Sequence, residues 1–140
     1  MKAKSYLQQI RRLDKKINNK QMQLESLQEL VTNITPILKD VNVQSNASQD
    51  RLGDTMAKII DLQNEINNEI DLYINKKLEA IKLINTIGDD VSISILTQRY
   101  INYKRWDEIA DNLSYTRQGV LKKHGQALLN FEKSVYMSLH

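Results

Sequence analysis

The sequence predicts an all-α protein: a long antiparallel, coiled-coil-like helical hairpin followed by a small three-helix module that contains a helix-turn-helix. Three observations favour this fold class. Apolar residues recur every three or four positions over most of the first 88 residues, the chain has one proline and four glycines, and the apolar spacing shortens afterwards. We expect residues 1–88 to form the hairpin, which would serve oligomerisation or partner binding, and residues 89–140 to form the second module.

The first helix is expected over residues 5–34. Taken in steps of four and three, its seam is apolar at eight of nine positions: Tyr6, Ile10, Leu13, Ile17, Lys20, Leu24, Leu27, Val31 and Ile34. A seam sustained over four heptads is typical of coiled-coil packing. Pro36 disfavours helical backbone at Thr35, so we expect the helix to end there.

Residues 36–49 are expected to be irregular, with Asn42, Ser45, Asn46 and Ser48 as turn or cap formers. A second long helix should then cover residues 50–87. Nine of its eleven seam positions are apolar: Leu52, Met56, Ile59, Gln63, Ile66, Ile70, Tyr73, Lys77, Ala80, Ile84 and Ile87. Gly88 is a natural C-terminal stop, and Asp89 and Asp90 are N-cap candidates for the next helix.

Charge favours pairing of these two helices. Residues 1–39 have a net charge of +5 and residues 40–88 have a net charge of −3, so a basic helix would face an acidic one. The second helix also has apolar residues away from its seam: Ile60, Leu62, Leu72, Ile74, Ile81 and Leu83. One partner helix cannot cover all of them, so we expect a homo-oligomer, most simply a dimer, built through the hairpin.

Composition and motifs bear on several function classes. The chain has no cysteine, which excludes disulfides and thiolate metal sites. No apolar run approaches the roughly 18 residues of a membrane span and no leader-like segment follows Met1, so we expect a cytoplasmic protein with no membrane partner. No phosphate-binding glycine loop, nucleophile motif or metal-ligand cluster is present. We therefore expect no enzyme activity, no cofactor and no metal.

Residues 89–140 should form three helices, with breaks at residues 102–104 and 114–115. A helix-turn-helix needs a small residue where its helices cross, and Ala110 meets that need. Ile109, Leu113 and Val120 would be the inner apolar residues. Trp106 is expected to anchor the core, and His124 to be a buried histidine that donates to a backbone carbonyl rather than a metal ligand.

The second helix of this motif would expose a surface suited to double-stranded DNA. No acidic residue occurs from Asn112 to Phe131, and arginine and glutamine can form bidentate hydrogen bonds with base edges. Gly119 and Gly125 cost helix stability, and we expect a close approach to a helix or a phosphate to compensate for them. The candidate DNA-binding residues are Thr116, Arg117, Gln118, Leu121, Lys122, Lys123, Lys104 and Arg105.

The run from Arg99-Tyr100 through Trp106-Asp107-Glu108-Ile109-Ala110 and Leu113-Ser114-Tyr115-Thr116 to Val120 resembles region 4 of sigma-70-type factors. In that pattern Arg105 stands where serine or threonine usually caps the helix, Ser114 replaces the turn glycine, and His124 fills a slot that is usually apolar.

More closely, the whole chain resembles a family of small phage and prophage proteins of low-GC Gram-positive bacteria, a domain of unknown function related to phage late-gene transcription regulators. The matching segments are Tyr6–Asp14, Lys39–Ser45 and His124–Leu128. The resemblance implies transcriptional control in the bacterial host cell, with RNA polymerase as a possible partner.

Two hypotheses remain. One is a sequence-specific transcription regulator in which Arg117, Gln118 and Lys122 read the DNA bases. The alternative is a protein-interaction adaptor or a phage-encoded inhibitor, for example one that binds RNA polymerase, with the hairpin as its active surface. Strong salt dependence of DNA affinity would distinguish them, because only phosphate contacts release counterions.

Overall fold

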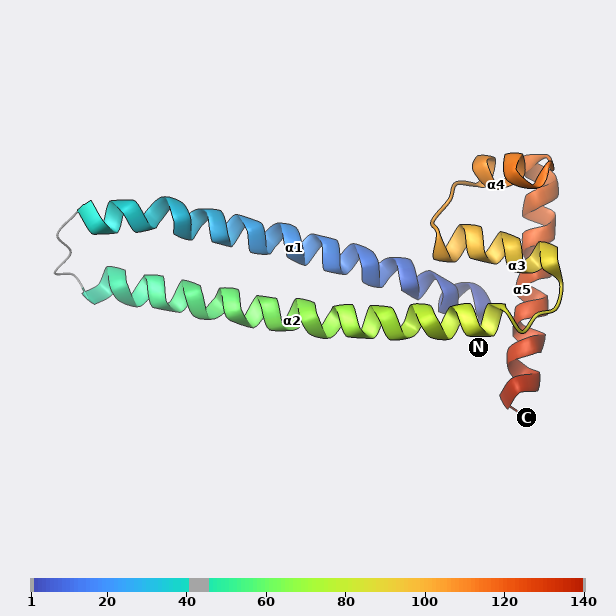
Figure 1. Ribbon diagram of the computed structural model, residues 1–140, viewed down its shortest axis with the longest axis horizontal. Helices are drawn as coiled ribbons and strands as arrows, with labels where there is room; N and C mark the ends of the chain where they lie inside the picture. The colour runs from blue at the N-terminus through green and yellow to red at the C-terminus, as the bar shows by residue number, and fades with distance from the viewer. Residues whose placement is uncertain (1, 41–45, 140) are drawn as a thin grey trace. The chain divides into compact units, whose positions relative to one another are not determined.

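A computed structural model describes residues 2–40 and 46–139 of the chain, and these residues contain five α-helices and no strand. This confirms the predicted all-α class. The elements in chain order are α1 (Ala3–Asp40), α2 (Asn46–Ile84), α3 (Asp90–Leu96), the π-helical turn η1 (Thr97–Ile101), α4 (Trp106–Leu113) and α5 (Arg117–Leu139) (Figure 1).

The chain divides into two compact units, and each long helix contributes to both. One unit is Lys15–Leu72; the other contains the residues up to Asp14 and those from Tyr73 onward. The start of α1 and the end of α2 therefore belong with the C-terminal helices. The boundary expected at residue 88 divides the chain by function, into an oligomerisation or partner-binding part and a DNA-binding part. That functional division stays a prediction.

The unit Lys15–Leu72 is a pair of antiparallel helical segments, one from α1 and one from α2 (Figure 1). Ile17, Ile59 and Ile66 are buried between them. The seam position Lys20 is polar, and its ammonium group pairs with Glu69 and with Glu65 Oε2 at 3.2 Å. Hydrogen bonding to Lys20 lowers the pKa of Glu69, so within this unit the opposite charges of the two helices meet across the seam.

The helix ends differ from those expected. α1 continues past Pro36 to Asp40, although proline lacks one backbone donor and costs a helix interior roughly 3 kcal/mol. Pro36 lies near the end of a 38-residue helix. The preference of the preceding residue for extended backbone is opposed there by the backbone hydrogen bonds of α1. α2 begins at Asn46, so residues 46–49 are helical rather than irregular. Asn42 and Ser45 lie outside the described residues.

Where side-chain burial is described, two seam positions and one residue off the seam depart most from the predicted pattern. Met56 and Gln63, both seam positions, are exposed, whereas Leu7, which is off the seam, is fully buried. Leu7 belongs to the unit that contains the C-terminal helices, where α1 has several neighbours instead of one. A two-helix heptad pattern therefore describes this part of α1 incompletely.

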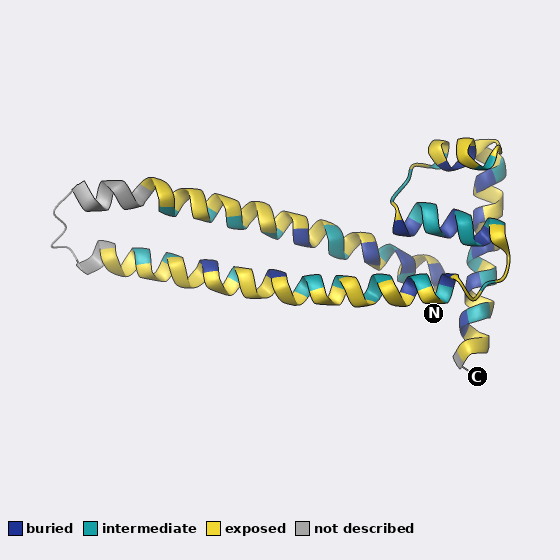
Figure 2. Ribbon diagram, in the orientation of Figure 1, coloured by how far each residue is buried: buried dark blue, intermediate teal, exposed yellow. Residues whose placement is uncertain are grey.

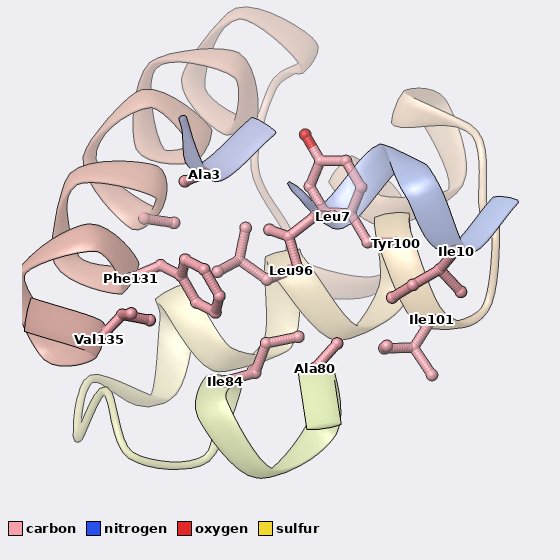
Figure 3. Close-up of a cluster of buried hydrophobic side chains, with 11 residues drawn as sticks. Ala3, Leu7, Ile10, Ala80, Ile84, Leu96, Tyr100, Ile101, Phe131 and Val135 are labelled. Atoms are coloured by element: carbon pink, nitrogen blue, oxygen red, sulfur yellow. The ribbon is translucent and has the colours of Figure 1, made fainter. Parts of the chain in front are cut away.

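The core of the unit that includes the C-terminal helices joins segments far apart in the sequence (Figure 3). Leu7 and Ile10 of α1, Ile84 of α2, Leu96 of α3 and Phe131 of α5 are all at most 1% exposed. Figure 2 shows buried residues along α3 and on one side of α5. The N-terminal turns of α1 are thus part of the core on which the C-terminal helices pack.

The link from α2 to α3 has the predicted stop and cap. Gly88 has a φ of +83°, a conformation that favours glycine. The Asp89 side chain accepts a hydrogen bond from the backbone N–H of Ser92 at 3.2 Å, and hydrogen bonding to Ser92 lowers the pKa of Asp89. α2 itself ends at Ile84, three residues before the expected end.

The predicted breaks in the C-terminal helices are confirmed: the chain leaves helical structure at residues 102–105 and 114–116. The first break follows η1, where Asn102 N–H donates to the Thr97 carbonyl at 3.0 Å. Tyr103 has a φ of +59° there. Its hydroxyl is 2.8 Å from the Tyr73 hydroxyl of α2, so a side-chain hydrogen bond links this break to α2.

Candidate nucleic-acid interface

Helices α4 and α5 are joined by a turn of three residues with specific backbone contacts. Ser114 adopts the left-handed conformation, with φ 59° and ψ 39°, and Tyr115 N–H donates to the Ala110 carbonyl at 2.9 Å. Thr116 Oγ1 then accepts a hydrogen bond from Gly119 N–H at 3.0 Å, which caps the start of α5. Hydrogen bonds therefore hold the turn at both ends, at the C-cap of α4 and at the N-cap of α5.

A small apolar core lies beneath this turn. Ile95, Ile109, Ala110 and Val120 are buried together, and Trp106 and Leu113 pack against them. Ala110 of α4 and Val120 of α5 thus share one buried cluster. Ile109, Val120 and Trp106 also occupy their predicted core positions.

The outward side of α5 presents the candidate residues to solvent. Arg117, Gln118, Leu121, Lys122 and Lys123 are all exposed. Gln118, Leu121 and Lys122 follow helical spacings of three and four, so they share one side of α5. Thr116 is exposed as well, but its hydroxyl oxygen is engaged as the helix cap. This side of α5 presents polar and basic groups, and the sequence has no carboxylate from Asn112 to Phe131.

The start of α4 brings carboxylates to the candidate cations, a feature that sequence reasoning missed. Arg117 Nε is 3.8 Å from Asp107 Oδ1, and Arg105 Nε is 3.2 Å from Glu108 Oε1. Both ion pairs are exposed to solvent. Both carboxylates lie in the first turn of α4, where the helix macrodipole stabilises acidic side chains.

The other candidates have different surroundings. Arg105 is the N-cap residue of α4 and makes no side-chain capping hydrogen bond. Lys104 is half-buried, and its carbonyl accepts a hydrogen bond from Arg99 at 3.0 Å. Lys123 lies 5.4 Å from the centre of the Tyr115 ring, on a different side of α5 from Lys122.

His124 is buried but has a different partner from the one expected. Its Nε2 is 2.6 Å from the Tyr100 hydroxyl, not bonded to a backbone carbonyl, and its ring packs edge-on against Trp106 at 4.6 Å. Burial, together with the positive charges of Lys4 and Arg99, lowers the pKa of His124 to about 4. The imidazole is therefore neutral at pH 7, and its Nε2 can accept a hydrogen bond from the Tyr100 hydroxyl.

The two glycines of α5 differ. A Cβ on Gly119 would lie 3.1 Å from Thr116 Oγ1, so the N-cap crowds this position. A Cβ on Gly125 would meet nothing within 4 Å. The prediction that another helix of the chain packs closely against Gly125 is therefore wrong. Gly125 follows Gln118, Leu121 and Lys122 along the same exposed side of α5.

Comparison with known proteins identifies the family. A family model described as a protein of unknown function, DUF1492, matches residues 30–132. The chain belongs to this family. The matched segment of the DUF1492 family takes in all of α2, α3, η1 and α4, and most of α5. No curated protein and no solved structure matches the chain.

Two features are absent from the part of this DUF1492 member that the structure describes. None of the helices there has both the length and the apolar character to cross a membrane. Residues 2–40 and 46–139 also contain no group of three or more histidine, aspartate or glutamate side chains placed to hold a metal ion.

Proposed function

We propose that the protein is a phage-type transcription regulator that binds double-stranded DNA through a sigma region 4-like helix-turn-helix formed by α4, the turn and α5. The observation that supports this most is the exposed side of α5. It places Arg117, Gln118 and Lys122 directly after a tight, capped turn, with no acidic residue from Asn112 to Phe131. A helix of this kind enters the major groove with its N-terminal residues against the bases.

The proposed roles follow from side-chain chemistry. Arg117, Gln118 and Lys122 would hydrogen-bond to base edges, and Leu121 would contact a thymine methyl group. Lys123, with Lys104 and Arg105 near the start of α4, would contact backbone phosphates. In this proposal the protein acts in the cytoplasm of a bacterial host, with RNA polymerase as a further partner.

We also propose a dimer through the segment Lys15–Leu72. This unit exposes several large apolar side chains, which would be covered in a dimer: Met22, Leu30, Met56, Ile60 and Leu72. Two copies would present two DNA-binding helices to an operator with two half-sites. The same exposed residues are the feature that favours the adaptor as the alternative function.

The test is DNA binding by the full chain on a duplex selected from a random library and on an unselected duplex. Arg117→Ala should cost ~1–3 kcal/mol on the selected duplex and less on the unselected one, with relaxed preference at one base pair. Lys123→Ala should weaken binding to both duplexes equally and reduce the salt slope by roughly one unit.

Lys58→Ala is the matched control, because Lys58 is an exposed lysine of α2. It should leave both affinities and the salt slope unchanged. If the wild-type chain selects no sequence and shows no salt slope, the DNA-binding proposal fails and the adaptor is the better hypothesis.

A further inference from the structure

A small cavity lies beside η1, within the unit that contains the C-terminal helices. It has a volume of about 170 Å³, several times the ~30 Å³ occupied by one water molecule. Side chains of α1, η1 and α4 line it: Lys4, Gln8, Arg11, Arg99, Tyr100 and Trp106. Lys4, Gln8 and Arg11 are spaced by four and three residues, so they share one side of α1.

The cavity has three cations and no carboxylate in its lining. Within residues 2–40 and 46–139, no ion pair joins Lys4, Arg11 or Arg99 to an acidic side chain. The nearby carboxylates at the start of α4 are paired with Arg105 and Arg117 instead. Three like charges around one cavity repel one another, and an anion between them would relieve this repulsion.

Two further observations indicate a positive, ordered site. The charges of Lys4 and Arg99 both lower the pKa of the buried His124, so their positive potential extends into the protein. Arg99 is also held in place, because its Nη1 donates to the Lys104 carbonyl at 3.0 Å and its guanidinium lies 4.5 Å from the centre of the Trp106 ring. An anion would find this donor already oriented.

We propose that this cavity binds a phosphate group, with Lys4, Arg11 and Arg99 as its cationic ligands and the Gln8 amide as a further donor. Donors from α1 and η1 approach from separate elements, which suits a tetrahedral anion with several acceptor oxygens. A planar carboxylate needs only one guanidinium. The Arg99 side chain lies over the Trp106 ring, which leaves that face closed to a stacked base.

The phosphate group can belong to a free phosphoryl compound or to the backbone of bound DNA. The first source makes the cavity a ligand site independent of the proposed function. The second extends the DNA contacts beyond α4 and α5 and depends on that function. The same variants distinguish the two sources.

The experiment uses the full chain and its single tryptophan, Trp106, which lines the cavity and reports on it by fluorescence. Inorganic phosphate is titrated at constant ionic strength against sodium chloride and sodium acetate. We expect a saturable change with phosphate alone. Arg11→Gln should weaken this response roughly tenfold or more, because it removes a charged hydrogen-bond donor.

Arg12→Gln is the matched control: the same change of charge at the next residue of α1, outside the cavity lining. It should respond as the wild type does. Both arginines are exposed, so both variants should fold, and circular dichroism checks that they do.

Affinity for an unselected duplex then identifies the source. If Arg11→Gln weakens duplex binding and Arg12→Gln does not, the phosphate is that of DNA; if neither does, it belongs to a free compound. The proposal is overturned if phosphate acts no differently from chloride or acetate, or if the two variants behave alike in both assays. The phosphate titration contains no DNA, so it can fail or succeed independently of the proposed function.

Discussion

Arg117 at the start of α5 and Asp107 in the first turn of α4 form an ion pair across the turn, with Nε and Oδ1 3.8 Å apart. The arginine that we propose to contact a base is therefore already paired with a carboxylate of the same protein. Both side chains are exposed, so the pair contributes little to stability and can open when a stronger acceptor arrives. In the proposed complex, a base edge would replace Asp107.

Asp107→Asn should increase DNA affinity, because it removes a competing acceptor and a charge that repels phosphate. An exposed pair is worth about 0.2–1 kcal/mol, so we expect a gain of roughly 1.5- to 5-fold, measured by fluorescence anisotropy. Asp111→Asn is the matched control on the same helix, because Asp111 is exposed and forms no ion pair in the described part of the chain. Equal gains in both variants would mean that only net charge matters.

Gly125→Ala should raise stability and lower DNA affinity in the same protein. A Cβ there meets no atom within 4 Å, and alanine is favoured over glycine in a helix by roughly 1 kcal/mol. On the side of α5 proposed to face DNA, the added methyl group would hold the helix away from the backbone. Urea denaturation measures the stability and fluorescence anisotropy measures the DNA affinity. Unchanged DNA affinity would contradict the proposal that Gly125 lets α5 approach the DNA backbone.

Ser114→Gly should stabilise the protein by about 0.5–1 kcal/mol. Ser114 occupies the left-handed region at φ 59°, where a side chain is strained and glycine is not. Ser114→Ala keeps the Cβ and should bring no such gain. Thermal denaturation of both variants makes the comparison, and a gain in the alanine variant equal to that of the glycine variant would contradict the strain argument.

His124 should make stability fall on acidification. Its pKa is about 4 in the folded protein and about 6.5 when unfolded, so the unfolded chain binds more protons between these values. The contribution is complete above pH 6.5 and is lost as the pH falls toward 4. We expect a loss of roughly 1–2 kcal/mol, allowing for partial solvation.

Urea denaturation at pH 7.5 and pH 5.0 measures this loss. Carboxylates also contribute to acid sensitivity, so the informative quantity is the difference between wild type and His124→Gln. The variant should lose less stability between the two pH values. The same loss in both proteins would show that His124 is solvated and titrates normally.

Ile66→Asp should disrupt the helix pair of the unit Lys15–Leu72. Ile66 is 4% exposed on the seam of α2, and an unpaired carboxylate there costs several kcal/mol. Ala57→Asp is the control, because Ala57 is an exposed residue of the same helix and should tolerate the change. Circular dichroism at rising temperature compares them, and native stability of the Ile66 variant would contradict the heptad seam.

Periodicity predicted which residues form helices, and local signals predicted several of the ends. Gly88 and Asp89 were identifiable because a left-handed stop and an N-cap depend on neighbouring backbone alone. Pro36 misled because its effect is local, whereas the helix around it is held by many hydrogen bonds. Leu7 was missed because its neighbours come from distant segments, which a single helix pattern does not record.

Of the candidate site, the position of the turn and the exposed side of α5 could be predicted, because both depend on a short stretch of sequence. The partners of individual side chains could not. Asp107 with Arg117 and Tyr100 with His124 join separate elements, and their pairing depends on how those elements pack. Charge and periodicity indicate a surface, while three-dimensional packing determines which groups on it are already engaged.

The backbone N–H of Ala3 donates to Glu132 across 129 residues of sequence. The first turns of α1 thus complete a core whose other members include the last helix. During translation these turns are made long before α5, so this part of the molecule can reach its final packing only once nearly all of the chain has been synthesised. Closing so long a loop also slows folding. A fragment that begins at residue 89 would lack Leu7, Ile10 and Ile84, and its apolar helix faces would remain open to water.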